Sequence, residues 1–222
     1  MKINRAIVSV SNKDGLKDLI AALAEENVEI ISSGGTHKHI TELGFQAIDI
    51  SEFTDHPEMM NGRVKTLHPK VHAGILANRD EHMNELESMS YLPIDLIVVN
   101  LYPFAETLKS GKEFSEVIEN IDIGGPTMIR AAAKNFKDVL VLSDPSQYEE
   151  FLSRKMEKTI DIDFRKRCAA RVFELMSQYD NLIAGYLSEN EKTNFIGTEH
   201  FKSPQQLRSV SYTHLRAHET VY

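Results

Sequence analysis

Apolar residues in the first fifty positions fall in short runs that alternate with helical spacing. The run AIVSV at 6–10 precedes Leu16, Leu19, Ile20 and Leu23, which share one helix face. Further strand-type runs follow at 28–31 and in FQAIDI at 45–50, with a second helical stretch between them. Because strands that alternate with helices build a parallel sheet covered by helices, the pattern predicts an α/β fold.

The strongest strand signal is IDLIVVN at 94–100, an almost continuous apolar run typical of a strand buried on both faces. Another strand is expected at 139–142. Helices are expected at 81–89, at 114–121, from Thr127 and at 146–155. From Asp163 to Tyr186 the apolar spacing predicts one long amphipathic helix with a structural role.

The chain changes character after Asn190, where it becomes polar and poorly periodic. We therefore expect one folded domain over residues 1–190 and a linker over 191–208. The last residues, 209–222, read SVSYTHLRAHETVY and show no clear period.

Composition narrows the classes of protein that the chain can represent. It has 222 residues, a formal net charge of −8 and a single cysteine, Cys168. No intrachain disulfide or cysteine-based metal cluster is possible, which fits the cytoplasm. No apolar run reaches the length of a membrane span, and the N-terminus does not resemble a signal peptide. The acidic balance argues against nucleic acid as a partner.

One passage, NGRVKTLHPKVHAGIL at 61–76, reverses the acidic character of the chain. It carries five basic or imidazole side chains without a carboxylate, namely Arg63, Lys65, His68, Lys70 and His72. Such a cluster is either a solvated basic face or a shaped loop for an anion. Thr66, Pro69 and the flanking glycines favour the shaped loop. His68 and His72 have the spacing of a zinc pair, but no third ligand is evident, so no metal is expected.

Four polar motifs follow predicted strands, where open parallel sheets bind ligands. SVSNK contributes Ser11 and Lys13, although an ordinary helix cap would look the same. SGGT, residues 33–36, puts two glycines at a helix start, which suits a phosphate or a simple tight turn. NLYP contributes Asn100 and Tyr102, and Tyr102 could equally pack on the edge of the core.

The fourth motif runs from Asp122 through GGPT to RAAAKN. The amides of Gly124 and Gly125 could stabilise negative charge that develops on an oxygen. Lys134, on the same helix, is either a proton donor or a surface lysine.

Taken together, SVSNK, SGGT, MMNGRVKTLHPKVHAGIL, VVNLYPF, IDIGGPT and RAAAKN resemble the inosine monophosphate (IMP) cyclohydrolase half of the bifunctional purine biosynthesis enzymes. The resemblance runs from about Arg5 to Asn190. It implies a methylglyoxal-synthase-like three-layer α/β fold with a mainly parallel sheet flanked by helices. It also implies closure of the purine ring of a formylated carboxamide ribonucleotide, with loss of water and without a cofactor or metal.

The resemblance implies a role for each matching residue. Lys134, Asp122, Tyr102 and Lys65 are expected to be catalytic, with Asp122 taking the carboxamide proton and Lys134 protonating the formyl oxygen. The other matching residues are expected to bind the nucleotide: Ser11, Lys13, Ser33, Gly34, Gly35, Thr36, Arg63, Thr66, Asn100, Gly124 and Gly125.

The resemblance ends near Arg208, where the family continues into a formyltransferase domain. We expect a truncated chain with a non-native tail at 209–222, no formyl transfer from folate, and a homodimer weakened by the missing domain. Three alternatives stay open: a methylglyoxal-synthase-like lyase, a regulatory domain like that of carbamoyl phosphate synthetase, and a purine-nucleotide-binding module without activity.

Overall fold

A computed structural model of the chain describes residues 1–188. The expected linker, 191–208, and the expected tail, 209–222, lie outside the described residues. The chain divides into a compact unit, Met1–Ile183, and a second unit, Ala184–Tyr222. Of the second unit, the structure describes residues 184–188, which include the end of the last helix.

The core is a five-stranded sheet in the order β3-β2-β1-β4-β5, and every neighbouring pair is parallel. Its strands are β1 Arg5–Val10, β2 Glu29–Ser32, β3 Ile48–Asp49, β4 Leu96–Asn100 and β5 Leu140–Leu142. All five predicted strands are confirmed, although β3 is much shorter than the apolar run at 45–50. In the central pairs, Ile7 of β1 lies opposite Ile31 of β2 and Ile97 of β4.

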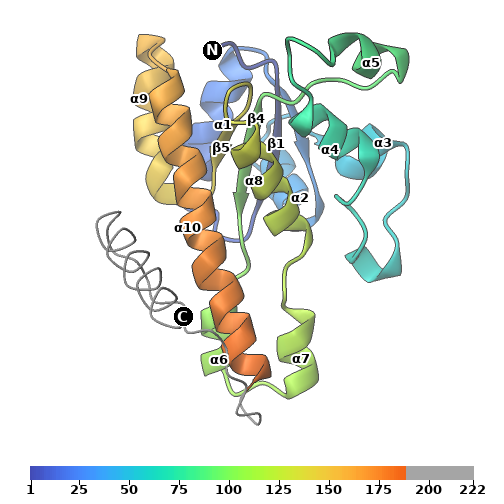
Figure 1. Cartoon of the computed structure of the whole chain (residues 1–222), viewed down its shortest axis with the longest axis vertical. Helices are drawn as coiled ribbons and strands as arrows, with labels where there is room; N and C mark the ends of the chain where they lie inside the picture. Colours follow the sequence, from blue (N-terminus) through green and yellow to red (C-terminus); the bar gives the residue numbers. More distant parts are fainter. Residues whose placement is uncertain (189–222) are drawn as a thin grey trace, which may run out of the picture. The chain divides into compact units, whose positions relative to one another are not determined.

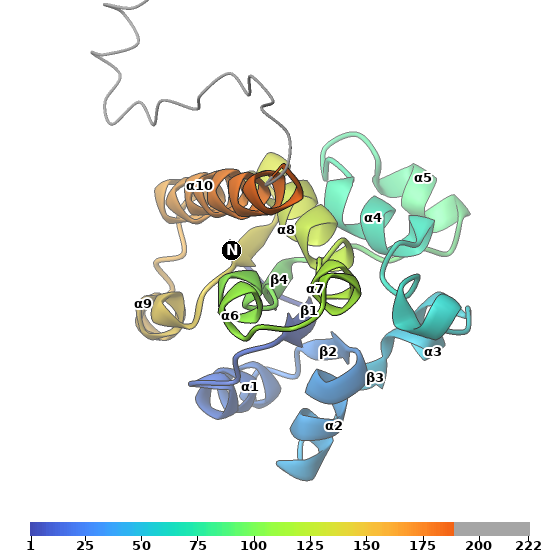
Figure 2. The same ribbon diagram turned by 90° about the horizontal axis from the view of Figure 1, so that it is seen from below.

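Helices cover both faces of the sheet, which confirms the predicted α/β class (Figures 1 and 2). One face carries α1 (Leu16–Glu25), α2 (Gly34–Glu42) and α9 (Tyr148–Glu157), and the other carries α4 (Pro69–Leu76) and α8 (Gly124–Lys134). The long helix predicted from Asp163 is α10, Ile162–Leu187. Four helices are shorter: α3 Ile50–Thr54, α5 Met83–Ser88, α6 Phe104–Lys109 and α7 Phe114–Glu119.

Apolar side chains from the sheet and both helix layers make up the core. Leu96, Ile97 and Val98 of β4 are fully buried, as expected for a strand covered on both faces. The apolar face of α1 is buried as its spacing predicts, with Leu19 and Ile20 at 0% exposure. No helix within residues 1–188 is long and apolar enough to cross a membrane.

Two local predictions are wrong. The basic passage is not a loop throughout, because α4 begins at Pro69. Proline suits the first turn of a helix, and the His68 Nδ1 caps that turn by accepting from the Lys70 N–H at 3.1 Å. The helix expected from Thr127 begins earlier, at Gly124, so the two glycines form its first turn.

The amino edge of the sheet is closed by buried charges. An Asp95 Oδ2 accepts from the backbone N–H groups of Asn4 and Arg5 at 2.8 and 3.1 Å. Arg79 lies 3.8 Å from Asp95 and donates to the Ile94 carbonyl at 2.7 Å. Burial lowers the pKa of Arg79, and Asp95 and Asp138 act against that shift. Because its hydrogen bonds are already made within the protein, this edge serves stability.

The strand order instead directs attention to the carboxyl edge. The chain builds outward from β1 through β2 to β3, then returns to add β4 and β5 on the other side of β1. The strand order reverses between β1 and β4, and open α/β sheets bind ligands beyond the carboxyl ends of the strands at such a point.

Gly74 tests the packing of α4 against the chain that leads into β4. A methyl group at Gly74 would lie 2.7 Å from the Leu92 carbonyl oxygen and 2.9 Å from the Ile94 Cδ1. Although alanine is the better helix former, we expect Gly74→Ala to lower the free energy of unfolding by about 1–3 kcal/mol through overpacking. Urea denaturation measures the change.

Gly185→Ala is the matched control for Gly74→Ala. Gly185 also lies within a helix, but a methyl group there would meet no atom within 4 Å. Stability should stay the same or rise by up to about 1 kcal/mol. An unchanged denaturation midpoint in Gly74→Ala would show that α4 moves aside and would contradict the packing argument.

Candidate active site

The carboxyl ends of β1 and β4 are joined by the side chain of Asn100. Its Oδ1 accepts from the N–H groups of Ser11 and Asn12 at 2.7 and 2.9 Å, and its Nδ2 donates to the Asn12 carbonyl at 2.8 Å. Asn100 also bonds Tyr148, whose pKa burial raises to about 12. Asn100 and Ser11 are thus brought together as predicted, but most of the hydrogen-bonding capacity of Asn100 goes to the backbone. Lys13 extends from the same loop, with its Nζ 3.5 Å from the Ser11 carbonyl.

The SGGT motif forms the first turn of α2, beside the end of β1. Gly34 and Gly35 are exposed there, and the first N–H groups of a helix have no partner within the helix. Thr36 is buried, and its hydroxyl both donates to the Val10 carbonyl and accepts from the Val10 N–H at 3.0 Å. Ser33 lies with its Oγ 3.5 Å from the Ser9 Oγ. The two glycines are therefore free to receive an anion, whereas the Thr36 side chain holds α2 against β1.

Lys65 reaches this helix start from the basic passage. Its Nζ lies 3.2 Å from the position that a Cβ would occupy at Gly34. The same amine pairs with the Glu58 Oε2 at 2.7 Å. Burial opposes ionisation of Asp49, but hydrogen bonds from Ser51, with His37 and Lys65 nearby, keep the pKa of Asp49 below its usual value. The structure thus joins Lys65 to the SGGT motif, as predicted, and adds Glu58 and Asp49, which the sequence analysis missed.

Gly124 and Gly125 bring three further segments to the start of α8. A Cβ at Gly124 would lie 2.5 Å from the Thr66 Oγ1, and a Cβ at Gly125 would lie 2.5 Å from the Asp122 Oδ2 and 2.9 Å from Leu101. Any larger residue would push these groups apart. The glycine pair is therefore required by the close approach of its neighbours, and Thr66, Asp122 and the segment after β4 meet at this point.

Asp122 is the carboxylate with the environment most suited to proton transfer. Burial raises its pKa, while its Oδ1 accepts from the Gly125 N–H at 2.9 Å, which opposes that shift. The Tyr179 hydroxyl of α10 accepts from the Asp122 N–H at 2.8 Å. The sequence gives no sign of this contact, because the periodicity of a helix does not show which of its tyrosines has a polar partner.

Within residues 1–188, no contact joins Arg63 or Tyr102 to the predicted site residues at the starts of α2 and α8. Arg63 is exposed and forms an ion pair with Glu119 of α7, which holds the pKa of the guanidinium above its usual value. Tyr102 is 57% exposed, so the structure does not support the alternative that it packs on the core edge.

Lys134 lies at the opposite end of α8 from Asp122. It is the last residue of this 11-residue helix, so its Cα lies about 15 Å along the axis from that of Gly124. The next residue, Asn135, donates to the Ile75 carbonyl at the end of α4. Figure 1 shows α8 running from the edge beside α6 and α7 toward the far edge of the sheet. Lys134 is exposed there and cannot reach the Asp122 carboxylate of the same chain.

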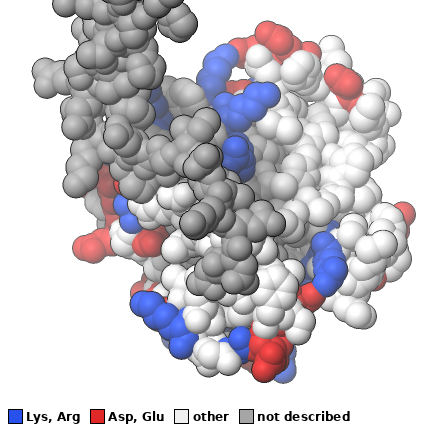
Figure 3. Space-filling view, turned by 60° about the horizontal axis from the view of Figure 1, so that its bottom comes forward, with Lys and Arg blue, Asp and Glu red and all other residues white. Residues whose placement is uncertain are grey.

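Where Figure 3 shows the surface of residues 1–188, its basic side chains do not form one continuous patch. Figure 3 shows Lys and Arg side chains in separate groups, some with acidic side chains beside them. The pairs Arg63–Glu119 and Lys65–Glu58 account for this locally. The reversal of charge seen in the sequence is therefore partly cancelled in the fold by carboxylates from other positions.

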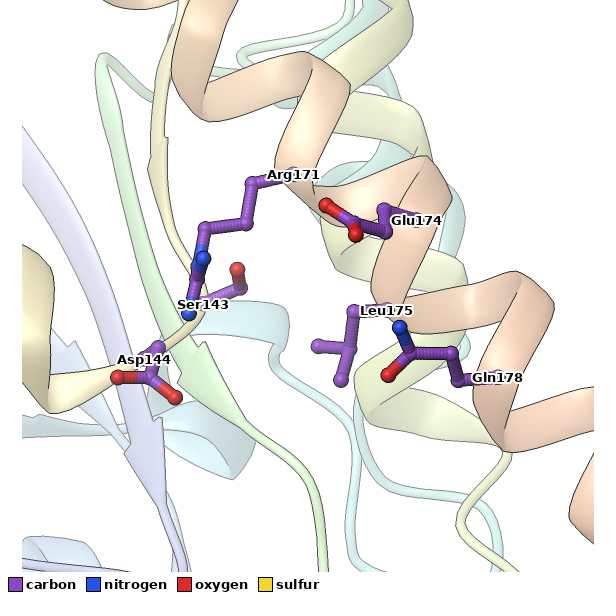
Figure 4. Close-up of a pocket in the computed structure, with 6 residues that line it drawn as sticks. All are labelled: Ser143, Asp144, Arg171, Glu174, Leu175 and Gln178. Atoms are coloured by element: carbon purple, nitrogen blue, oxygen red, sulfur yellow. The ribbon is translucent and has the colours of Figure 1, made fainter. Parts of the chain in front are cut away.

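A small pocket lies beyond β5, apart from the residues discussed above. Ser143 and Asp144 line it from the strand end, and Arg171, Glu174, Leu175 and Gln178 line it from α10 (Figure 4). Hydrogen bonds from Ser146, with Arg171 nearby, keep the pKa of Asp144 below its usual value although burial opposes this. None of the predicted site residues lines this pocket.

Comparison with known proteins agrees with the fold and extends along the chain. The model of the MGS-like domain matches residues 15–127, and that of the AICARFT/IMPCHase bienzyme matches residues 132–218. The chain is 48% identical to the bifunctional purine biosynthesis protein PurH of Clostridium acetobutylicum over 219 residues. It is 49% identical to PurH of Clostridium botulinum strain Hall over 218 residues. Each match covers 97% of this chain and 44% of the relative.

A solved structure also resembles this chain in fold. The crystal structure of ForH superposes with a TM-score of 0.73 and 30% sequence identity, covering 81% of this chain and 94% of that one. The chain spans less than half the length of the curated relatives. It belongs to the MGS-like domain family and is similar throughout to the N-terminal part of the PurH proteins.

Proposed function

We propose that this chain is an IMP cyclohydrolase, which closes the purine ring of 5-formamidoimidazole-4-carboxamide ribonucleotide. The carboxamide nitrogen attacks the formyl carbon, and the formyl oxygen leaves as water with one hydrogen from the carboxamide nitrogen and one from the formamide nitrogen. The observation that carries the proposal is the convergence of Lys65, Thr66, Asp122 and the start of α8 at the switch point of the sheet. The likeness to the PurH proteins supports the same activity.

The phosphate of the nucleotide belongs at the start of α2. Gly34 and Gly35 are exposed there, and Lys65 adds a cation 3.2 Å from the Cβ position of Gly34. Free N–H groups and the helix dipole favour a phosphate at such a position. Lys13 and Ser33, at the neighbouring strand ends, complete this binding region.

The reacting groups belong at the start of α8. Nucleophile and electrophile are parts of one molecule, so the protein mainly holds the reactive conformer and moves protons. Asp122 accepts a proton from the carboxamide nitrogen, since desolvation makes its carboxylate a stronger base than an exposed one. Gly124 and Gly125 offer amides to the formyl oxygen as it takes up negative charge.

Protonation of the departing oxygen falls to Tyr102 in this proposal, because Lys65 is occupied by the nucleotide phosphate. Tyr102 lies two residues after Asn100 on an exposed stretch, where a ligand can reach its phenol. Lys134 is at the far end of α8, so the proposal gives it no proton to transfer within its own chain. Arg63 binds the base only if the ligand displaces Glu119.

The same proposal covers the wider setting of the chain. Residues 1–190 carry the reaction as one domain, the partner is a small nucleotide rather than a nucleic acid, and the protein works in the cytoplasm as a homodimer. Support comes from the PurH relatives, which are bifunctional purine biosynthesis proteins. Formyl transfer from folate is assigned to the longer relatives and not to residues 1–190.

The direct test supplies purified chain with the formylated ribonucleotide, without folate or metal, and follows IMP by chromatography. Production above the buffer rate is expected. Tight binding of IMP without turnover would favour a nucleotide-binding module. Neither binding nor turnover would overturn the proposed function and leave the family assignment alone.

Lys65→Met distinguishes the two lysines. Removing the amine should lower kcat/KM by about 10–100-fold, because the phosphate loses a charged hydrogen-bond donor, while the side chain keeps most of its volume. Lys134→Met is the matched control, and its kcat/KM should stay within about threefold of the parent, because surface substitutions perturb a structure little. Loss of activity in Lys134→Met with retention in Lys65→Met would reverse the roles.

The raised pKa of Asp122 predicts the acid limb of the rate profile. A base must be ionised to work, so kcat should fall as pH drops through a pKa that lies above the usual value near 4. Measuring kcat between pH 4 and 9 locates the limb. Asp122→Asn should lose most activity at every pH, and a limb that persists unchanged in this variant would assign it to another group.

A further inference from the structure

A carboxylate of the protein already stands beside the proposed phosphate position. The Glu58 Oε2 lies 2.7 Å from the Lys65 Nζ, and that amine lies 3.2 Å from the Cβ position of Gly34. Gly34 is the first residue of α2, so the Lys65 amine sits between a helix N-terminus and Glu58. The acidic side chain therefore neutralises the cation that the nucleotide phosphate would use.

A short hairpin holds Glu58 in this position. Met59 and Val64 exchange backbone hydrogen bonds at 3.1 and 3.3 Å, which brings the flanking residues Glu58 and Lys65 together. The second carboxylate oxygen of Glu58 lies over the turn, 2.6 Å from where a Cβ would stand at Gly62. One oxygen thus contacts the lysine and the other occupies the space that glycine leaves open.

The turn of this hairpin is conformationally costly. Met60, Asn61 and Gly62 have φ values of 53°, 54° and 90°, and the left-handed region is disfavoured for a residue such as methionine. Met60 is 71% exposed and gains little burial in return. The hairpin is held by the Met59–Val64 bridge, by two backbone hydrogen bonds within the turn and by the Glu58–Lys65 ion pair, which is the side-chain contact that a ligand can compete for.

Electrostatic interactions favour replacement of the Glu58 carboxylate by a phosphate at the Lys65 amine. Without an anion, the Lys65 ammonium would face the positive end of the α2 dipole, and Glu58 relieves that repulsion. The Glu58 side chain is 45% exposed, so the pair contributes little free energy and opens at small cost. A phosphate carries more charge than a carboxylate and can also accept from the N–H groups of α2.

We propose that Glu58 is an internal stand-in for the ligand phosphate, which occupies Lys65 in the empty site and is displaced when a phosphate binds. The inference deepens the proposed function, on which it rests for the identity of the nucleotide. Glu58 competes with the ligand for one amine, and the hairpin opens as the phosphate enters. The residue sets affinity and selects for dianionic groups over weaker anions.

Glu58→Gln tests this competition, because it removes the charge while keeping the shape. IMP, ribose 5-phosphate and inorganic phosphate are titrated into the full chain by calorimetry, with ³¹P line broadening for the weaker ligands. Loss of a partly exposed ion pair that competes with the ligand should tighten binding by about two- to fivefold for all three. Circular dichroism checks that the variant folds.

Glu42→Gln is the matched control. Glu42 is the last residue of α2 and pairs with Lys38 at 3.8 Å on the surface. Its replacement by glutamine changes the net charge by the same amount as Glu58→Gln. Its affinity for the three ligands should stay at the parent value. Equal tightening in both variants would assign the effect to net charge and overturn the proposal.

The remaining outcomes separate this inference from the proposed function. Equal or weaker phosphate binding in Glu58→Gln would overturn the competition and make Glu58 a residue that positions Lys65. If the parent binds no IMP, the nucleotide assignment fails. Tighter binding of inorganic phosphate in Glu58→Gln would then still support the stand-in, whereas no phosphate binding by either protein would overturn it.

Discussion

The hydrogen bonds of Asn100 hold the loop after β1 against the end of β4, at the sheet edge where we propose that the nucleotide binds. One side chain joins segments 88 and 89 residues apart in sequence through the N–H groups of Asn12 and Ser11. The strand order reverses at this point, so the loops after β1 and β4 diverge from it. Backbone pairing of Val10 with Asn100 aligns the two strand ends, and the Asn100 side chain adds the start of the loop after β1 to this alignment.

Close contact with the first turn of α8 fixes the positions of Thr66 and Asp122. The glycine pair at 124–125 allows the Thr66 hydroxyl and the Asp122 carboxylate to touch the first turn of α8. The same contact shields Asp122 from water, which raises its pKa, and gives it an amide partner. The packing at the start of α8 and the environment of Asp122 therefore both depend on Gly124 and Gly125. A larger residue at either position would disturb both.

Local signals in the sequence are sufficient to predict the helices and strands, but they do not predict which side chains form ion pairs across the fold. The apolar run of β4 and the SGGT helix start depend on neighbours in sequence, so both could be predicted. The ion pair of Arg63 with Glu119 depends on a tertiary contact, and that of Lys65 with Glu58 depends on a hairpin. The periodicity of the sequence shows neither. Lys134 shows a different limit of the sequence: its motif adjoins that of Asp122, yet the rise of α8 puts its Cα about 15 Å along the axis from that of Gly124, and its role stays a prediction.

The proposed binding of a phosphate by an acidic chain poses an electrostatic conflict, to which the placement of Glu58 and Glu119 is relevant. The net charge of −8 repels phosphates at long range, while the cations of the basic passage attract them at short range. With Glu58 and Glu119 paired to Lys65 and Arg63, the empty site presents little excess positive charge to passing anions. A ligand gains affinity only if it replaces both the charge of a carboxylate and its hydrogen bonds. Charge that is compensated within the protein thus makes shape and donor geometry, rather than net attraction, the basis of selection.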